Sequence, residues 1–451
     1  MSKRKVAFLT LGCKVNQYET DAMEEILEKK GYEIVGFKEM ADVYIINTCS
    51  VTNMADRKSR QMIHRAKKNN PDAVIVAAGC YVQAAEKEMA EKSMADILVG
   101  NNKKKDIAQI LEEYFAVKEE EQSVPVISEV LDINHTKEYE NMTIHKVNEH
   151  TRAYIKIQDG CNQFCSYCII PYTRGRIRSK NPEEVIAEVK NLAAQGYKEI
   201  VLTGIHLSSY GKDLEDNITL LDVIKRIQQV EAVKRIRLGS LEPRIITEEF
   251  VRELKQCDKV CPHFHLSLQS GCDETLKRMN RKYTTEEYEA ALTILRKYYE
   301  HPALTTDVIA GFVGETEEEF EKTRAYLEKI NLYEMHIFKY SVREGTRAQK
   351  MSGHVPEQVK TERSDILLAM ARSHKSEFEK WYIGRKEKVL LEEIIEKNGK
   401  KYFQGYTAHY VKVAIELPEN NTKLKQNEEI IVEIQGFIDE NLLYGKVSIE
   451  F

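Results

Sequence analysis

The stretch Cys161-Asn162-Gln163-Phe164-Cys165-Ser166-Tyr167-Cys168 sets three cysteines in a C-x3-C-x2-C pattern. A strand-like run, 153–157, precedes it and a basic segment, 174–178, follows it. Three thiolates this close can hold one metal centre. An iron–sulfur cubane takes up to four such ligands, so three would leave one iron open. The alternatives are a zinc knuckle and a buried apolar trio, but neither Cys nor His follows closely enough to be a fourth zinc ligand.

Length and composition restrict the class of protein. The chain has 451 residues, enough for two or three domains. Its net charge of −5 means that any nucleic-acid contact must come from local basic patches. The nine cysteines are too few and too unevenly placed for a secreted disulfide scaffold, and no run approaches the length of a membrane span. We therefore expect a cytoplasmic protein with no membrane partner.

The first part of the chain, 1–117, alternates between strand and helix patterns. Strand-like runs stand at 5–10, 43–47, 74–78 and 96–99, and helical segments at 16–30, 53–68, from 81 onward and 103–115. This alternation predicts an α/β domain with a doubly wound parallel sheet. The acidic segment 119–121 marks its end, and 118–146 is interpreted as a connector.

Three further cysteines occupy one kind of position in that pattern. Cys13, Cys49 and Cys80 each follow a predicted strand. The carboxyl ends of parallel strands meet at one crevice, so these thiols are expected to lie together and to hold a second metal centre. The alternative is that Cys serves as a small apolar residue at each strand end. The charged run 56–60 lies beside the same crevice, either as a solvated helix face or as a contact for an anionic substrate.

The middle part, 147–377, repeats the alternation about six times. Strand-like runs stand at 153–157, 199–203, 233–238, 264–268, 304–309 and 335–338, with helical segments between them. This predicts an open (βα)6 partial TIM barrel, which a large substrate can enter from the side.

The loops after these strands carry the candidate cofactor contacts. Carboxyl-end loops build the site of a βα barrel, glycines admit a ligand close to the backbone, and polar side chains can bind a ribose or an ammonium group. The candidates are Tyr167, Gly204, Ser240, Glu242, Gln269 and Gly311. His206, His263 and His265 are interpreted as structural histidines. Cys257, Cys261 and Cys272 are interpreted as ordinary cysteines, with Cys272 the nearest to a site loop.

The last part, 378–451, changes character. Five strand-like runs, at 389–396, 401–405, 409–415, 429–435 and 444–451, predict a small five-stranded β-barrel of the oligonucleotide-binding (OB) kind. Its charge is slightly acidic, so RNA binding would depend on one face and on aromatic residues such as Tyr402, Tyr406 and Tyr410. A plain structural cap is the alternative. We expect this part to contribute RNA affinity and no chemistry.

With all three parts in view, the chain resembles the radical S-adenosylmethionine (SAM) methylthiotransferases from end to end. The last part is similar to their TRAM RNA-binding domain. The runs TLGCKVNQ (10–17), NTCSVTN (47–53), ADRKSRQ (55–61) and LTGIH (202–206) resemble the branch that acts on N6-threonylcarbamoyladenosine at position 37 of bacterial tRNA. Val313 replaces a usual proline and Lys180 a common arginine; neither is a proposed cluster ligand.

The resemblance implies two 4Fe–4S clusters and SAM. Cys161, Cys165 and Cys168 would hold the cluster that binds and cleaves SAM to a 5′-deoxyadenosyl radical. Cys13, Cys49 and Cys80 would hold a second cluster that carries the incoming sulfur. A radical route suits carbon 2 of adenine, whose C–H bond is strong and not acidic. The implied partners are the tRNA anticodon loop, whose unpaired bases can enter a pocket, an electron donor such as flavodoxin or ferredoxin, and a sulfur donor that the sequence does not identify.

Two rival interpretations stay open at this point. The first is a methylthiotransferase for isopentenyladenosine or for a ribosomal-protein side chain. The second is a non-catalytic iron–sulfur protein that binds RNA or senses redox state. The polar strand-end loops argue against the second rival, because a sensor needs no SAM contacts.

Overall fold

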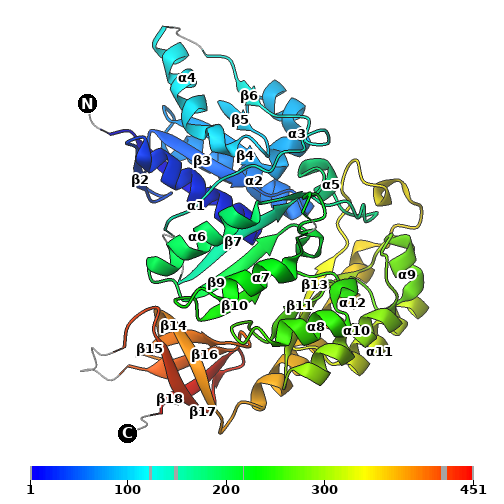
Figure 1. Cartoon of the computed structure of the whole chain (residues 1–451). Helices are drawn as coiled ribbons and strands as arrows, with labels where there is room; N and C mark the ends of the chain where they lie inside the picture. Colours follow the sequence, from blue (N-terminus) through cyan, green and yellow to red (C-terminus); the bar gives the residue numbers. More distant parts are fainter. Residues whose placement is uncertain (1–2, 121–123, 147–150, 217, 418–423, 449–451) are drawn as a thin grey trace.

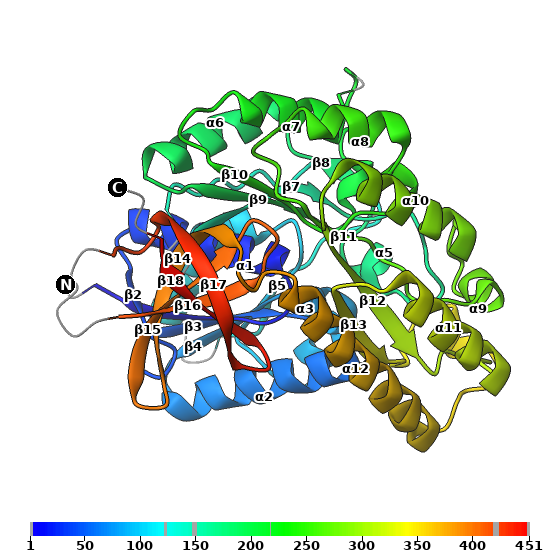
Figure 2. The same cartoon turned by 90° about the horizontal axis from the view of Figure 1, so that it is seen from below.

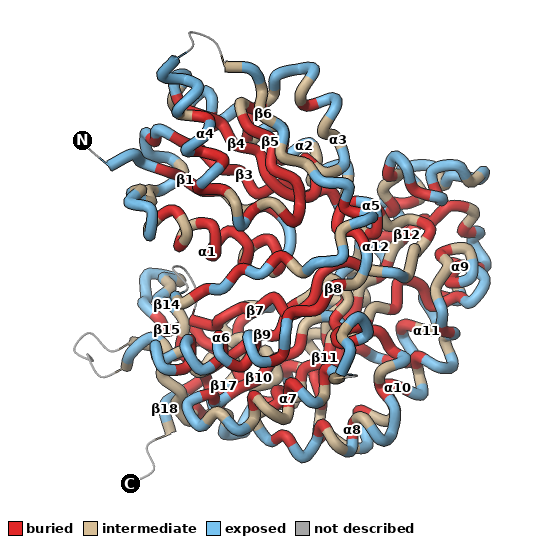
Figure 3. Tube along the Cα trace, turned by 45° about the horizontal axis from the view of Figure 1, so that its top comes forward, coloured by how far each residue is buried: buried red, intermediate tan, exposed pale blue. Residues whose placement is uncertain are grey.

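The computed structural model describes residues 3–120, 124–146, 151–216, 218–417 and 424–448. Figure 1 shows an N-terminal part at the top, a central part below it, and a C-terminal barrel at the lower left. Buried residues follow the strands and the inner faces of the helices (Figure 3). Within the described ranges, every helix is too short or too polar to cross a membrane.

The N-terminal part is a six-stranded parallel sheet in the order β2-β1-β3-β4-β5-β6. Its elements are β1 (Lys5–Thr10), α1 (Lys14–Lys29), β2 (Glu33–Val35), β3 (Val43–Thr48), α2 (Asn53–Asn69), β4 (Val74–Gly79), α3 (Cys80–Glu91), β5 (Ile97–Val99), η1 (Lys104–Asp106), α4 (Ile107–Glu120) and β6 (Ile127–Glu129). Alternate strand residues point to opposite faces. Val43 and Ile45 join α1 and α4 in one core, whereas Tyr44 and Ile46 join α2 and α3 in another.

The central part contains six parallel strands in two groups. Its elements are β7 (Arg152–Asp159), α5 (Ile170–Thr173), β8 (Arg178–Ser179), α6 (Pro182–Ala194), β9 (Glu199–Gly204), η2 (Leu207–Ser209), α7 (Leu220–Gln228), β10 (Arg235–Leu238), η3 (Pro243–Ile245), α8 (Glu248–Lys255), β11 (His263–His265), α9 (Asp273–Arg278), α10 (Thr285–Tyr298), β12 (Ala303–Ala310), α11 (Glu317–Ile330), β13 (Glu334–Lys339), η4 (Ala348–Lys350) and α12 (Glu357–Lys380). Parallel bridges Ile236–Val260 and Leu241–Leu266 join the group β7-β9-β10 to the group β11-β12-β13. The helices form an outer arc around these strands (Figure 2).

The N-terminal part bridges the gap between the first and last parallel strands of the barrel. On one side, Glu19 of α1 pairs with Lys156 of β7 at 2.7 Å. On the other side, Arg343, just past β13, pairs with Asp56 at 2.7 Å and donates to Ser50 Oγ at 2.8 Å. The sequence predicts a barrel that is open at its side. In the structure, the N-terminal part, whose strand-end loops carry Cys13, Cys49 and Cys80, lies against that opening.

The C-terminal part is a closed barrel of β14 (Lys386–Lys397), β15 (Lys400–Thr407), β16 (Lys412–Glu416), β18 (Leu442–Val447) and β17 (Glu429–Asp439). The predicted strand at 444–451 is found as β18, and residues 449–451 lie outside the described residues. The barrel docks on the central sheet through Arg235, which donates to the carbonyls of Tyr406 and Lys388, each at 2.8 Å. The predicted α/β fold with parallel sheets and a C-terminal sheet domain is therefore confirmed.

Candidate functional site

The triplet loop after β7 is folded tightly onto the basic segment that follows it. Cys161 N donates to the Gly175 carbonyl at 3.0 Å, and Cys168 N donates to the Cys165 carbonyl at 3.0 Å. Gly160 has a φ of +71°, and a Cβ there would lie 1.8 Å from the Arg176 carbonyl oxygen. Glycine is therefore required before the first cysteine. The three thiols are free and partly exposed.

Burial and nearby hydrogen-bond donors act on the thiols of the triplet. Burial raises the pKa of Cys161 to about 11 and also raises that of Cys168. Arg281 Nη1 donates to Cys165 Sγ at 3.2 Å, and the Gln163 backbone N donates to Cys161 Sγ at 3.5 Å. Such donors stabilise thiolates around an iron–sulfur cluster. The donor set therefore fits the cluster that the pattern predicts.

The second cysteine set gathers at the carboxyl edge of the N-terminal sheet. Cys13 caps α1, Cys49 follows β3, and Cys80 begins α3. A Cβ on Gly12 would lie 2.8 Å from Cys49 Cβ and 2.9 Å from its Sγ, so these two loops touch. Burial, together with the nearby Cys80 and Cys13, raises the pKa of Cys49 to about 11. Three mutually close thiols on three loops are a set that a second cluster fits.

A buried ion network joins the two cysteine sets. Arg174, six residues past the triplet, is fully buried and pairs with Glu19 at 2.8 Å and with Asp159 at 3.1 Å. It also donates to Asn16 Oδ1 at 2.6 Å. Asn16 in turn donates to the carbonyls of Leu11 and Thr48, at 2.7 and 2.9 Å. A side chain from the triplet segment thus holds the loops of the other set.

This network stays charged at neutral pH. Burial alone would raise the pKa of Glu19, but Arg174, Lys104 and Lys156 hold it well below its usual value. Burial would likewise lower the pKa of Lys156, but Asp159 and Glu19 raise it. Removing one member of a buried ion network leaves an uncompensated charge, so the members depend on each other.

Two of the predicted cofactor residues are connected to the triplet. Glu242 accepts from Gln163 Nε2 at 3.2 Å and from Arg244 Nε at 2.9 Å, and His206 Nε2 lies 3.5 Å from it. Burial would raise the pKa of Glu242, but His206 and Arg244 hold it at about 2.

Ser240 reaches the triplet indirectly. Its hydroxyl lies 2.9 Å from that of Ser267, whose carbonyl accepts from Arg281 Nη2 at 3.2 Å. Arg281 is the residue that contacts Cys165. The third strand end therefore meets the triplet through both Glu242 and Ser240.

The remaining candidates surround the same region. The Tyr167 ring packs edge-on against Phe312, with centroids 6.2 Å apart. Gly204 is the last residue of β9. Gln269 lies four residues past the end of β11, forms an isolated parallel bridge with Val308 of β12, and has a φ of +75°. A Cβ on Gly311 would lie 2.4 Å from Lys360 Cγ, so the space beside this glycine is taken by α12.

Comparison with known proteins decides the family. Residues 5–100 match the uncharacterized protein family UPF0004, and residues 155–327 match the radical SAM superfamily. The threonylcarbamoyladenosine tRNA methylthiotransferase MtaB of Bacillus subtilis is 42% identical over 92% of this chain and 91% of its own. This chain belongs to the radical SAM methylthiotransferase family. The tRNA-2-methylthio-N(6)-dimethylallyladenosine synthase of Clostridium botulinum is 38% identical over 85% of each chain.

Solved structures share the fold of this methylthiotransferase. The radical S-adenosylmethionine methyltransferase TsrM from Kitasatospora setae aligns with a TM-score of 0.56 at 16% identity and covers 75% of each chain. At this identity the likeness concerns the fold alone.

Sequence reasoning missed three polar residues that this methylthiotransferase places at its cysteines. Arg281 lies in a loop between helices, where no strand end pointed to it. Asn101 donates to Cys80 Sγ at 3.5 Å and to the Thr173 carbonyl at 2.7 Å. It follows β5, so the strand-end argument that selected the cysteines could have found it. Arg174 stood in the quoted basic segment, but its partners Asn16 and Glu19 lie more than 150 residues away.

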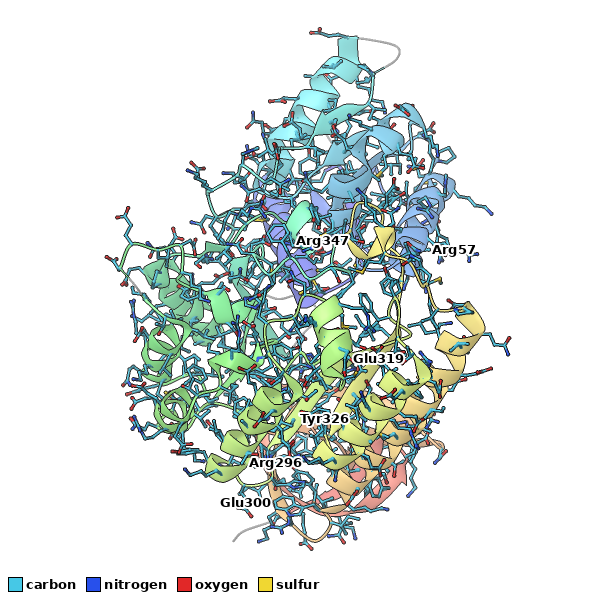
Figure 4. The ribbon with its side chains drawn as sticks, turned by 90° about the vertical axis from the view of Figure 1, so that its right-hand side faces the viewer. Arg57, Arg296, Glu300, Glu319, Tyr326 and Arg347 are labelled. Atoms are coloured by element: carbon cyan, nitrogen blue, oxygen red, sulfur yellow. The ribbon has the colours of Figure 1, made fainter. Side chains whose placement is uncertain are left out.

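The charged run of α2 divides between structural and exposed roles. Asp56 pairs with Arg343, and Arg60 donates to the Tyr81 hydroxyl at 2.9 Å. Arg57 and Lys58 are exposed. Figure 4 labels Arg57 on α2 and Arg347 on the segment after β13. The Asp56–Arg343 pair joins these two segments.

Proposed function

We propose that this chain adds a methylthio group to carbon 2 of N6-threonylcarbamoyladenosine at position 37 of tRNA, next to the anticodon. The product is 2-methylthio-N6-threonylcarbamoyladenosine. The observation that carries this proposal is the pair of cysteine sets joined through Arg174. The match to MtaB over nearly the whole chain supports the choice of nucleoside.

The proposed domains follow the structure in order. Residues 1–117 form a doubly wound auxiliary-cluster domain, supported by the apolar cores on both faces of its parallel sheet. Residues 118–146 form a connector, of which 121–123 lie outside the described residues. Residues 147–377 form the radical SAM domain, whose start at 147–150 is likewise outside them. Residues 378–451 form a TRAM domain, supported by the closed five-stranded barrel.

The proposed cofactors are two 4Fe–4S clusters and SAM. When bound, the cluster at Cys161, Cys165 and Cys168 supplies the electron that cleaves SAM, and the one at Cys13, Cys49 and Cys80 supplies a site for the incoming sulfur. The SAM contacts are Tyr167, Gly204, Ser240, Glu242, Gln269 and Gly311. Glu242 is anionic at neutral pH and can accept a hydrogen bond from the SAM ammonium group.

The proposed RNA path runs over the exposed rim near the triplet. Arg57, Lys58 and Arg347 are exposed and can contact phosphates. Arg176 lies 4.5 Å above the Phe164 ring, and Tyr172 packs edge-on against the same ring. Aromatic faces of this kind stack unpaired bases. The electron donor would be a flavodoxin- or ferredoxin-type protein; the sulfur donor is left open.

The identity of the substrate nucleoside is tested by comparing tRNA from cells with and without the gene. We expect the deletion strain to lose 2-methylthio-N6-threonylcarbamoyladenosine and to accumulate N6-threonylcarbamoyladenosine, because the substrate is then left unmodified. The 38% identity to a dimethylallyladenosine synthase makes the isopentenyladenosine enzyme the second candidate. Loss of 2-methylthio-isopentenyladenosine in its place would favour that candidate and refute the first.

A further inference from the structure

Three metal-ligating side chains meet on the inner face of the barrel, away from both cysteine sets. They are His265 of β11, Asp307 of β12 and His336 of β13, three strands that are neighbours (Figure 2). Asp307 stands directly opposite His336 in the sheet register. One ligand atom from each side chain lies within 4.8 Å of the other two. His265 Nε2 and Asp307 Oδ2 lie 3.3 Å apart.

The strand pattern directs these side chains into the barrel. They alternate with Phe264, Val308 and Met335, which are buried against the outer helices. His265 and Asp307 are 16% and 31% exposed, and His336 is exposed. The trio is therefore reachable from the space inside the barrel and is held on a rigid sheet.

A hydrogen bond prepares His265 as a ligand. Its Nδ1 lies 3.0 Å from the hydroxyl of Thr305, which is buried. When Nδ1–H donates to this hydroxyl, Nε2 presents its lone pair toward Asp307. Metal-bound histidines usually donate their other ring N–H to such a partner. The His265 and His336 rings stack with their centroids 5.8 Å apart. Both imidazoles can therefore reach one ion bound beside Asp307.

We propose that His265, Asp307 and His336 bind one divalent transition-metal ion, Zn²⁺ or Fe²⁺. Two imidazoles and one carboxylate form the set that these ions prefer, whereas Mg²⁺ and Ca²⁺ prefer oxygen ligands alone. Three protein ligands leave positions open toward the inside of the barrel. This gives His265 a role that the sequence did not indicate.

If the proposed function holds, the tRNA substrate supplies groups that can fill the open coordination positions of the metal. The threonylcarbamoyl group carries a carboxylate, a hydroxyl and a carbonyl oxygen, all of which are metal ligands. Asp307 lies on β12 four residues before Gly311, which directly follows that strand, so the two are ~13 Å apart at ~3.3 Å per residue. Phe338, on the same face of β13, is 47% exposed and can stack against the base. We infer that the metal takes the threonyl carboxylate, a part that rests on the proposed function.

The metal site is tested with Zn²⁺ on the cluster-loaded full chain. After equilibrium dialysis, the wild type should retain one Zn²⁺ per chain, with N/O ligands at ~2.0–2.1 Å in the zinc-edge X-ray absorption spectrum. His336→Ala and Asp307→Asn should bind Zn²⁺ at least tenfold more weakly at unchanged iron content. His354→Ala, an exposed histidine elsewhere, is the matched control. Equal Zn²⁺ binding by all four proteins, or sulfur ligands at ~2.3 Å, would overturn the site.

The carboxylate ligand is tested with two RNA hairpins that differ only at position 37. A hairpin with N6-threonylcarbamoyladenosine should tighten Zn²⁺ binding about tenfold relative to one with adenosine, since coupling between two ligands is reciprocal. Equal Zn²⁺ affinity with both hairpins bound would overturn this ligand. Failure to methylthiolate the modified hairpin at all, with SAM and reductant present, would instead count against the proposed function.

Discussion

Arg281 places a positive charge at the triplet Cys161, Cys165 and Cys168, the proposed ligands of one cluster. Its guanidinium donates to Cys165 Sγ at 3.2 Å and lies 4.8 Å from the Tyr283 ring centroid. A positive charge and a hydrogen bond at a ligand sulfur stabilise the reduced, more negative state of an iron–sulfur cluster. With the proposed cluster bound at Cys165, Arg281 would therefore influence how readily that cluster accepts an electron.

Replacing Arg281 by Met should lower the midpoint potential of this cluster by on the order of tens of millivolts. The measurement is a redox titration followed by electron paramagnetic resonance, without SAM. Arg281→Lys should restore part of the shift because it returns the charge. Arg347→Met, at an exposed arginine, should leave the potential unchanged. If Arg281→Met keeps its iron and its potential, the residue has no such role.

At the scale of elements, the junction between β4 and α3 positions Cys80, a proposed cluster ligand. Gly79 has a φ of +98° and is followed at once by Cys80, the first residue of α3. A Cβ on Gly79 would lie 2.6 Å from Asn47 Oδ1 and 2.9 Å from the Thr48 carbonyl oxygen. Any side chain here must displace the end of β3, which leads into Cys49.

Gly79→Ala should therefore cost more stability than a left-handed backbone alone, which costs ~1–2 kcal/mol. Gly399→Ala is the matched control, because Gly399 has a φ of +72° and nothing within 4 Å of its Cβ position. Urea unfolding of the cluster-free proteins gives the difference. We expect Gly79→Ala also to lose iron from the second set. If both variants lose the same free energy of unfolding, the neighbours of Gly79 move aside at no cost, and the close contact does not destabilise the protein.

The strands with continuous apolar runs could be predicted from the sequence. Elements that are held mainly by tertiary contacts could not. The Val- and Ile-rich β3 and β4 stand where the sequence predicts, because both faces are buried. The 24-residue α12 was missed. Apart from the short run 366–371, most of its residues are polar, and ion pairs hold it, such as Lys375 with Glu334 at 2.6 Å. Such pairs join segments that no local pattern relates.

At the scale of the whole molecule, the C-terminal barrel contacts both the N-terminal and the central part. The Lys14 ammonium, next to Cys13, lies 6.0 Å from the Tyr410 ring centroid. Arg237 donates to the Ala408 carbonyl at 3.0 Å and lies 4.6 Å from the same ring. The sequence predicted the barrel and the cysteine sets separately. The relative arrangement of the barrel and the cysteine sets could not be predicted from the sequence, because this arrangement depends on charged and aromatic side chains that come together from all three parts.

The barrel interface should weaken in mild acid. The pKa of His409 is lowered from 6.5 to about 4, mainly by burial and then by the charges of His301 and Arg237. A hydrogen bond with the Glu300 backbone acts in the opposite direction. The unfolded chain therefore binds a proton below pH 6.5 that the folded chain does not bind until about pH 4. The stability that His409 contributes is complete above pH 6.5 and is lost as the pH falls.

Between pH 7 and pH 5, wild-type stability should fall by about 2 kcal/mol more than that of His409→Gln, which cannot take up this proton. Denaturant unfolding of the cluster-free proteins at both pH values measures the difference. The other buried histidines are present in both proteins, so their contributions to the pH dependence cancel in the difference. Identical falls for the two proteins would contradict the neutral, buried state of His409.

The division of labour between the two cysteine sets is tested most directly by Cys49→Ala. The variant is incubated anaerobically with SAM, reductant and tRNA carrying N6-threonylcarbamoyladenosine, and both products are quantified by mass spectrometry. Cys257→Ala, at a buried cysteine outside both sets, is the control and should behave as wild type. We predict that Cys49→Ala still forms 5′-deoxyadenosine, because the triplet is intact, but forms no 2-methylthio-N6-threonylcarbamoyladenosine. A normal rate of methylthiolation by Cys49→Ala would contradict the account.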